Sequence, residues 1–317
     1  MAISRAQVFN TASTTTSGSS ITPAWPATVN AGDLGVLVVL SKRGVTISTP
    51  SGWTLDPNAE FSGGAGADGA NSGTVKATVF YKVAAGTEDG TTVTVSFSGG
   101  TTNVVTGRIG TYQNATGSWS IAAANGADSA GGNSGWTATT SSDPGITAND
   151  LIIALFGCNS STPTHSAESL TTSGVTYGTL VEQLDAGVAS GDTVRFVLCE
   201  VPVSSGTSSG NTTFAGTAST NGTNYPAGPI ILLRLREVSA GSIDRARQAR
   251  AALRMAANAR RIASAQLLRL IQGNAPLARS FVNAQYGTAT PGTGLSGVGH
   301  DGGHAASRLR RIKRRRN

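Results

Sequence analysis

The stretch Asp33-Leu-Gly-Val-Leu-Val-Val-Leu40 has a counterpart further along the chain, Asp150-Leu-Ile-Ile-Ala-Leu-Phe156. In both copies an Asp at a polar turn precedes a short, continuous apolar run. An Asp at such a turn can accept hydrogen bonds from nearby backbone N–H groups and so fix the turn. Short apolar runs are typical of strands that are buried on both faces or lie at the core of a sandwich. This repeated pair of features therefore predicts buried β-strands.

Further landmarks recur in the same order, which indicates a weak internal duplication. The corresponding stretches, first copy before second, are 49–55 and 171–177, 74–83 and 193–201, and 104–112 and roughly 229–235. Apolar and polar side chains largely alternate in residues 75–83, and this period of two is typical of a strand with one face inward.

We therefore predict a mainly β protein. Its body is an antiparallel, internally duplicated, jelly-roll-like β-sandwich, followed by a C-terminal α-helix and an extended basic tail. Residues 1–118 form the first half of the sandwich and residues 119–238 the second. Each half offers about four to six strands, which is few for closing a core alone. The halves either share one sandwich or form two sandwiches in tandem.

The order of these motifs resembles β-sandwich domains in structural proteins of tailed bacteriophages. The resemblance rests on Gly-Asp-Leu at 32–34, Thr-Pro-Ser-Gly-Trp-Thr-Leu at 49–55 and Phe-Tyr-Lys-Val at 80–83, and it covers about residues 8–237. It implies a virion component, for which a minor tail protein is the first expectation. The second copy departs from the pattern because Val175 replaces Trp53, so its core packing is expected to differ.

Charge divides the chain at about residue 240. Residues 241–317 carry fifteen Lys or Arg and only two acids, Asp244 and Asp301, which gives a net charge of +13. The whole chain carries +7, so residues 1–240 carry the difference, −6. A strongly basic segment attached to a mildly acidic body usually contacts another molecule.

The first part of this basic segment, residues 241–273, is predicted to form an amphipathic helix. Ser242 is a good N-cap, and Gly273 followed by Pro276 is a good stop. Small and apolar residues lie on one helical face, and the opposite face carries Arg247, Arg250, Arg254 and Arg261. The small-residue face favours packing against copies of the chain or against a neighbour. A helix lying on a membrane is less favoured, because the apolar face lacks Trp and Phe.

The remaining residues, 274–317, are predicted to form a Gly-rich tether that ends in a basic cluster. The cluster consists of Arg308, Arg310, Arg311, Lys313, Arg314, Arg315 and Arg316. Three interpretations stay open: a solubilising end, docking on acidic protein surfaces, and contact with nucleic-acid phosphates. Docking on protein is favoured over nucleic acid, because no aromatic residue lies among these arginines to stack on bases.

No arrangement in the sequence points to catalysis or to a cofactor. His300, Asp301 and His304 have the residue types of a metal site but lack a fourth ligand, so a solvated loop is preferred. Cys158 and Cys199 are interpreted as inert thiols at or near strand ends, and His165 as a loop residue. We find no signal peptide, no apolar run long enough to span a membrane, and no phosphate-binding Gly loop.

Together these features predict a non-enzymatic structural component of a tailed phage particle, assembled in the host cytoplasm. The first expectation is a minor tail protein, anchored by its basic residues to other virion proteins and to copies of itself. One alternative is a capsid decoration or head-fibre protein. Another is a carbohydrate-binding adsorption module, in which Trp53 would stack on a host surface glycan.

Overall fold

The computed structural model describes residues 3–10, 12–15, 18–42, 44–64, 74–99, 104–128, 135–159, 164–188, 194–218, 227–238 and 254. The described residues up to 238 belong to one compact unit, Met1–Arg245, and Arg254 belongs to a second unit, Ala246–Asn317. The predicted helix at 241–273 and tail at 274–317 lie outside the described residues, except that Arg254 is helical and exposed.

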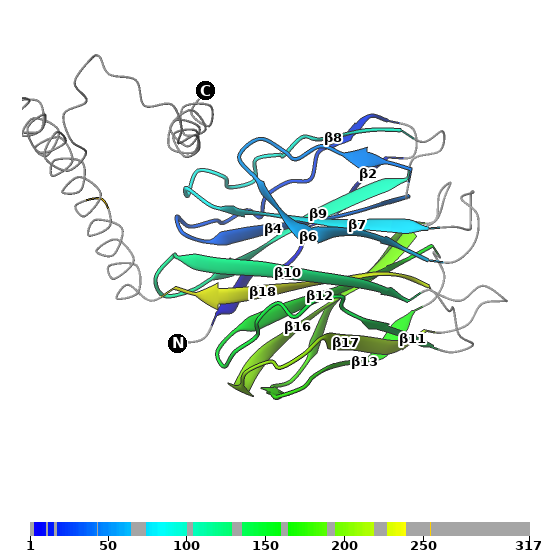
Figure 1. Cartoon of the computed structure of the whole chain (residues 1–317). Coiled ribbons are helices and arrows are strands. Elements are labelled where there is room, and N and C mark those ends of the chain that lie inside the picture. Colours follow the sequence, from blue (N-terminus) through cyan, green and yellow to red (C-terminus); the bar gives the residue numbers. More distant parts are fainter. Residues whose placement is uncertain are drawn as a thin grey trace, which may run out of the picture. The chain divides into compact units, whose positions relative to one another are not determined.

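The described body is built of β-strands, and the prediction of a mainly β, antiparallel protein is confirmed (Figure 1). The first half holds β1 (Ser4–Gln7), β2 (Ser13–Thr15), β3 (Ser20–Ile21), β4 (Leu34–Lys42), β5 (Thr46–Ile47), β6 (Thr54–Gly63), β7 (Val75–Val83), β8 (Val95–Ser98) and β9 (Val105–Gln113). The second half holds β10 (Trp119–Asp128), β11 (Gly135–Thr139), β12 (Leu151–Cys158), β13 (His165–Thr172), β14 (Val175–Tyr177), β15 (Val181–Val188), β16 (Val194–Gly206), β17 (Thr212–Ala218) and β18 (Gly228–Glu237).

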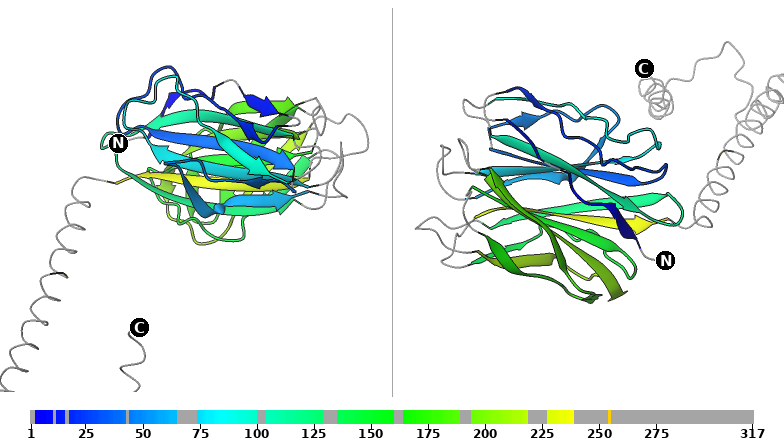
Figure 2. Two further views of the ribbon diagram at one scale, coloured as in Figure 1. Left: turned by 90° about the horizontal axis from the view of Figure 1, so that it is seen from above. Right: turned by 180° about the vertical axis from the view of Figure 1, so that it is seen from behind.

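Each half forms one large and one small sheet. The large sheet of the first half has the order β1-β9-β4-β7-β6, with β2 also paired to β9, and its small sheet has the order β3-β8-β5. The large sheet of the second half has the order β10-β18-β12-β16-β14, with β15 also paired to β16, and its small sheet has the order β11-β17-β13. The four sheets are stacked as layers, with the two large sheets in the middle (Figures 1 and 2).

The strand order of the first half repeats in the second, as the sequence landmarks predict. In the first half β4 lies between β7 and β9, and in the second β12 lies between β16 and β18. Leu34 is paired with Tyr112 of β9, and Leu151 is paired with Leu235 of β18. This register makes Leu34 and Leu151 structurally equivalent. It also gives each residue of β9 a structurally equivalent residue on β18.

Three hydrophobic clusters hold the layers together. One lies inside each half, between its small and large sheets, and the third lies between the two large sheets. All residues of β4 and β12 are buried, because one face of each strand contributes to a half's own core and the other to this central core. The halves therefore form two sandwiches, packed together through their large sheets.

The repeated Asp residues fix equivalent turns, as the sequence predicts. The backbone N–H of Asn30 donates to Asp33 Oδ2 at 2.8 Å, and the N–H of Thr147 donates to Asp150 Oδ2 at 2.7 Å. The residue before each Asp adopts the left-handed conformation, with φ of 91° at Gly32 and 71° at Asn149. Gly and Asn are the residue types that tolerate this conformation best. The same turn thus feeds the buried central strand of each large sheet.

Candidate functional site

The sequence-predicted anchor residues cannot be placed, apart from one of them. Arg254 is exposed. The others lie outside the described residues: Arg247, Arg250, Arg261, Arg308, Arg310, Arg311, Lys313, Arg314, Arg315 and Arg316. The motif containing His300, Asp301 and His304 also lies outside them. The anchor role therefore stays a prediction.

Trp53 lies in the core of the first sandwich. It is 7% exposed, and its ring lies 5.1 Å from that of Trp25, centroid to centroid, with the planes tilted by 35°. Trp25 in turn covers Gly35, where a Cβ atom would come within 2.2 Å of the indole ring. Trp53 is thus placed to fill the core, and its ring presents little surface on which a sugar could stack.

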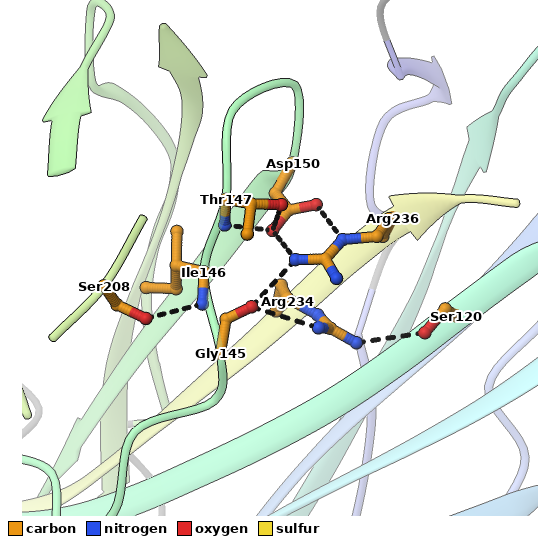
Figure 3. A network of polar contacts seen from close by, with 8 residues as sticks. All are labelled: Ser120, Gly145, Ile146, Thr147, Asp150, Ser208, Arg234 and Arg236. Carbon is orange, nitrogen blue, oxygen red and sulfur yellow. Dashed lines mark hydrogen bonds and ion pairs between the residues drawn. The ribbon is translucent and has the colours of Figure 1, made fainter. Parts of the chain in front are cut away.

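Asp150 is the centre of a polar network that ties β18 to the turn before β12 (Figure 3). Its two carboxylate oxygens accept hydrogen bonds from Nε and Nη2 of Arg236, each at 2.7 Å. The Asp150 side chain is fully buried, and that of Arg236 is 33% exposed. The hydrogen bonds that Arg236 donates to Asp150 raise the pKa of Arg236 above its ordinary value. Such a bidentate pair fixes both side chains in one geometry.

Arg234, two residues before Arg236 on β18, extends this network. Its Nη1 donates to the carbonyl oxygen of Gly145 at 3.2 Å, and its Nη2 donates to Ser120 Oγ at 3.1 Å (Figure 3). Arg236 Nη2 donates to the same carbonyl at 2.8 Å. Burial, followed by the charge of Arg236, lowers the pKa of Arg234. Because these donors converge on the turn at 145–150, the network holds that turn against β10 and β18.

A second polar cluster lies inside the second sandwich, around His165. Its Nδ1 lies 3.0 Å from Asp185 Oδ1, and its backbone N–H donates to Asp185 Oδ2 at 2.9 Å. Arg195 Nε also donates to Asp185 Oδ1, at 2.6 Å. On the other side of the ring, Cys158 Sγ lies 3.9 Å from His165 Nε2. The His165 side chain is fully buried.

The electrostatics of this cluster keep the imidazole protonated. Burial alone would lower the pKa of His165, but the hydrogen bonds and charges of Asp185 and Cys158 outweigh it and raise this pKa to about 9. Burial would raise the pKa of Asp185, but its bonds to His165 and Arg195 hold this pKa well below the ordinary value. Two cations therefore share one carboxylate inside the sandwich.

Cys158, His165 and Asp185 have the residue types of a nucleophile, a base and an orienting acid. Their geometry opposes that role. Cys158 has no solvent exposure, so a substrate could not reach its thiol. The arrangement is suited to holding β12, β13, β15 and β16 together. For catalysis, a thiol reachable by a substrate would be required.

Two sequence interpretations are corrected here. His165 was expected in a loop, but it is the first residue of β13 and is buried. Its polar sequence neighbours favour a loop, whereas its ionic partner Asp185 lies twenty residues away, so local pattern could not reveal the pair. Cys199 was expected at or near a strand end, but it lies within β16. Burial, followed by the charges of nearby carboxylates, raises the pKa of its thiol.

Polar contacts also lock the two sandwiches to each other. Tyr112 Oη of the first half donates to Glu200 Oε1 of the second at 2.7 Å. Trp119 Nε1 of the second half donates to the carbonyl oxygen of Gly32 at 2.8 Å. Because these bonds flank a continuous apolar interface, we expect the two sandwiches to move as one body.

Two further features bear on the predicted sites. Within the described ranges, no three His, Cys, Asp or Glu side chains are grouped as metal ligands would be. The same part of the chain contains no helix with the length and apolar character needed to cross a membrane.

Comparison of the chain with protein-family models, with curated proteins and with solved structures found no match.

Proposed function

We propose that this chain is a non-enzymatic structural component of a tailed-phage particle, in which the β body is displayed and residues 241–317 hold it to neighbouring proteins. A minor tail protein is the form that the sequence resemblance favours. A capsid decoration or head-fibre protein remains the alternative. The proposal places the protein in the virion.

The separation of charge carries this proposal. In the body, Arg5, Arg195 and Arg236 each lie within ion-pair distance of a carboxylate of the same body. Residues 241–317 have fifteen basic side chains and two acids, so most of their cations have no acid to pair with in their own segment. Arginine forms strong bidentate bonds to carboxylates, which suits an anchor on acidic protein surfaces.

The strand order of the body supports the same proposal. In each half the chain crosses several times between two antiparallel sheets, and its last strand lies between its first and a central strand. We infer that each half is a jelly roll, an architecture used by viral capsid and lectin domains. Fold does not specify function, so this order is consistent with a virion protein and does not by itself require one.

The test is whether the chain is present in purified phage particles, and at which position. Particles would be purified from the host that carries the gene, the chain quantified by mass spectrometry, and its position found by electron microscopy with antibodies against the body. Label on the tail is the expected result. Label confined to the capsid would replace the tail assignment by the head alternative. Absence of the chain from purified particles would contradict the proposal altogether.

A further inference from the structure

A pocket of about 470 Å³ opens between the two sandwiches. It is lined on one side by Thr14 of β2 and by Thr106 and Arg108 of β9, and on the other by Val188 of β15 and Phe196 of β16. Thr14 is exposed whereas Thr106 and Phe196 are buried, so the pocket leads from the surface into the interface between the large sheets. Its volume lies within the range of about 300–1,000 Å³ that is typical of small-molecule sites.

Arg108 places a charge on the face of β9 that also carries Thr106 and Tyr112 and meets the central core. It is paired with Val38 of β4, as Ile231 is paired with Leu155 of β12, so Arg108 and Ile231 are equivalent. Val38, Leu155 and Ile231 all belong to the central core. The first half therefore presents a guanidinium to the interface at the point where the second half presents an isoleucine, and a pocket accompanies the change.

The guanidinium of Arg108 has few partners. Its Nη1 donates to the carbonyl oxygen of Asn10 at 3.2 Å, and its Nε is buried without a hydrogen-bond partner. Within the described residues no carboxylate lies at ion-pair distance from Arg108, unlike Arg5, Arg195 and Arg236. Burial lowers the pKa of Arg108, and no opposite charge in the described part of the chain offsets this effect. A half-buried cation without a counter-ion carries a desolvation cost that an anion in the pocket would relieve.

We propose that this pocket binds a small organic anion, with Arg108 paired to a carboxylate or phosphate group of the ligand. The planar fork of arginine matches both groups. The hydroxyl groups of Thr14 and Thr106, which are joined by a hydrogen bond of 2.9 Å, offer further polar contacts. Phe196 and Val188 form the apolar wall, on which the C–H face of a sugar ring or another non-polar part of the ligand can pack. This inference does not depend on the proposed function.

Isothermal titration calorimetry on the full chain tests the proposal with three probes: glucuronate, glucose 6-phosphate and neutral glucose. We expect at least one of the two anions to bind with a Kd below about 1 mM, and glucose not to bind in this range. The comparison of glucuronate with glucose 6-phosphate tells a carboxylate site from a phosphate site. If neither anion binds more tightly than glucose, the proposal is overturned.

Three variants assign the binding to this pocket. Arg108→Gln is expected to raise the Kd at least tenfold. Lys82→Gln removes one positive charge from the opposite face of the same sheet and is expected to bind as the unmodified chain does. Because residues 241–317 are present in every variant, non-specific binding by their charge cancels. Unchanged affinity in Arg108→Gln would overturn the proposal.

Arg108→Lys keeps the test decisive if the Gln variant does not fold. It retains the charge and removes the bidentate fork, so a weaker affinity for the same anion supports the proposal. An affinity equal to that of the unmodified chain would mean that the guanidinium fork does not hold the ligand, and would overturn the proposed pairing with Arg108.

Discussion

The two sandwiches share one strand order, yet their polar residues differ at equivalent positions. Where the second half has Arg234 and Arg236 on β18, the first half has Thr111 and Gln113 on β9. The fully buried Asp150 therefore has a bidentate arginine partner, whereas among the described residues Asp33 keeps only the turn bond of the shared pattern. The apolar strands and the turn define the common fold, and polar side chains added to it distinguish the halves.

The cores differ in the same way. In the first sandwich Trp25 and Trp53 are packed over Gly35. In the second, Val175 stands in place of Trp53, and the aromatic centre comes from Trp136, which is stacked on Phe156 at a centroid distance of 4.0 Å. The expectation that the second core is packed differently is confirmed. One backbone pattern thus accepts two aromatic cores: Trp25 and Trp53 lie outside the strands, whereas Trp136 and Phe156 lie on β11 and β12.

The largest expected effect comes from removing the aromatic centre of the second sandwich. Trp136 is 1% exposed and contacts both Phe156 and Phe214. We expect Trp136→Ala to lower the free energy of unfolding by about 3–5 kcal/mol. Chemical denaturation followed by circular dichroism measures this loss. Because the central core couples the halves, both should unfold in one transition. Two separate transitions would show that the sandwiches are independent.

The next largest effect is the difference in stability loss between alanine variants of the two acids that fix the turns, Asp150 and Asp33. Asp150→Ala removes the partner of Arg236 as well as the turn bond, and we expect a loss of about 2–3 kcal/mol, because the partly exposed Arg236 recovers some hydration. Asp33→Ala removes the turn bond alone, and we expect a loss of about 1 kcal/mol. Denaturation of the two variants in parallel checks the order. Equal losses would mean that the arginine pair adds nothing to stability.

A smaller effect is the alkaline pH dependence that His165 gives to the second sandwich. The pKa of His165 is about 9 in the folded chain, above the ordinary histidine value of about 6.5. Its stabilisation is therefore complete below pH 6.5 and is lost as the pH rises through about 9. The lowered pKa of Asp185 acts in a separate acidic window, where stability is lost as the pH falls. Melting temperatures of the unmodified chain and of His165→Gln between pH 6 and 10 test this, and parallel curves would contradict it.

The smallest effect concerns Arg108 in the absence of any anion. Because the equivalent residue of the second half, Ile231, belongs to the central core, we expect Arg108→Ile to leave the free energy of unfolding within about 1 kcal/mol of the original value. Denaturation in an anion-free, uncharged buffer measures the change. A loss of several kcal/mol would instead make Arg108 a structural residue of the interface.

The sequence predicted much of the fold, because it depends on local pattern. The buried runs at Leu34 and Leu151, the turn role of Asp33 and Asp150, and the duplication follow from apolar periodicity and turn chemistry. The sequence could not decide between one shared sandwich and two sandwiches packed through their large sheets. A strand that is buried on both faces is a continuous apolar run in either arrangement. One feature of the candidate pocket was missed in the sequence. In the register of β9 and β18, Arg108 occupies the position at which the second copy has Ile231.

The polar clusters around His165 and Asp150 could not be predicted from local sequence patterns, because their members lie far apart in the chain. His165 and Asp185 are twenty residues apart, and Asp150 and Arg236 are eighty-six apart. The fold brings such pairs together, and their spacing in the sequence does not predict the contact. The basic anchor, by contrast, was predicted from composition alone, and it lies outside the described residues apart from Arg254.

The most direct test of the central claim is the amount of chain incorporated into purified particles when the terminal basic cluster is changed. In one variant all seven basic residues between 308 and 316 become Gln, and in a matched control residues 305–317 keep their composition in scrambled order. If charge anchors the body, the Gln variant falls at least about tenfold in copies per particle, while the scrambled control is retained. Incorporation of the Gln variant at the level of the unmodified chain would contradict the account.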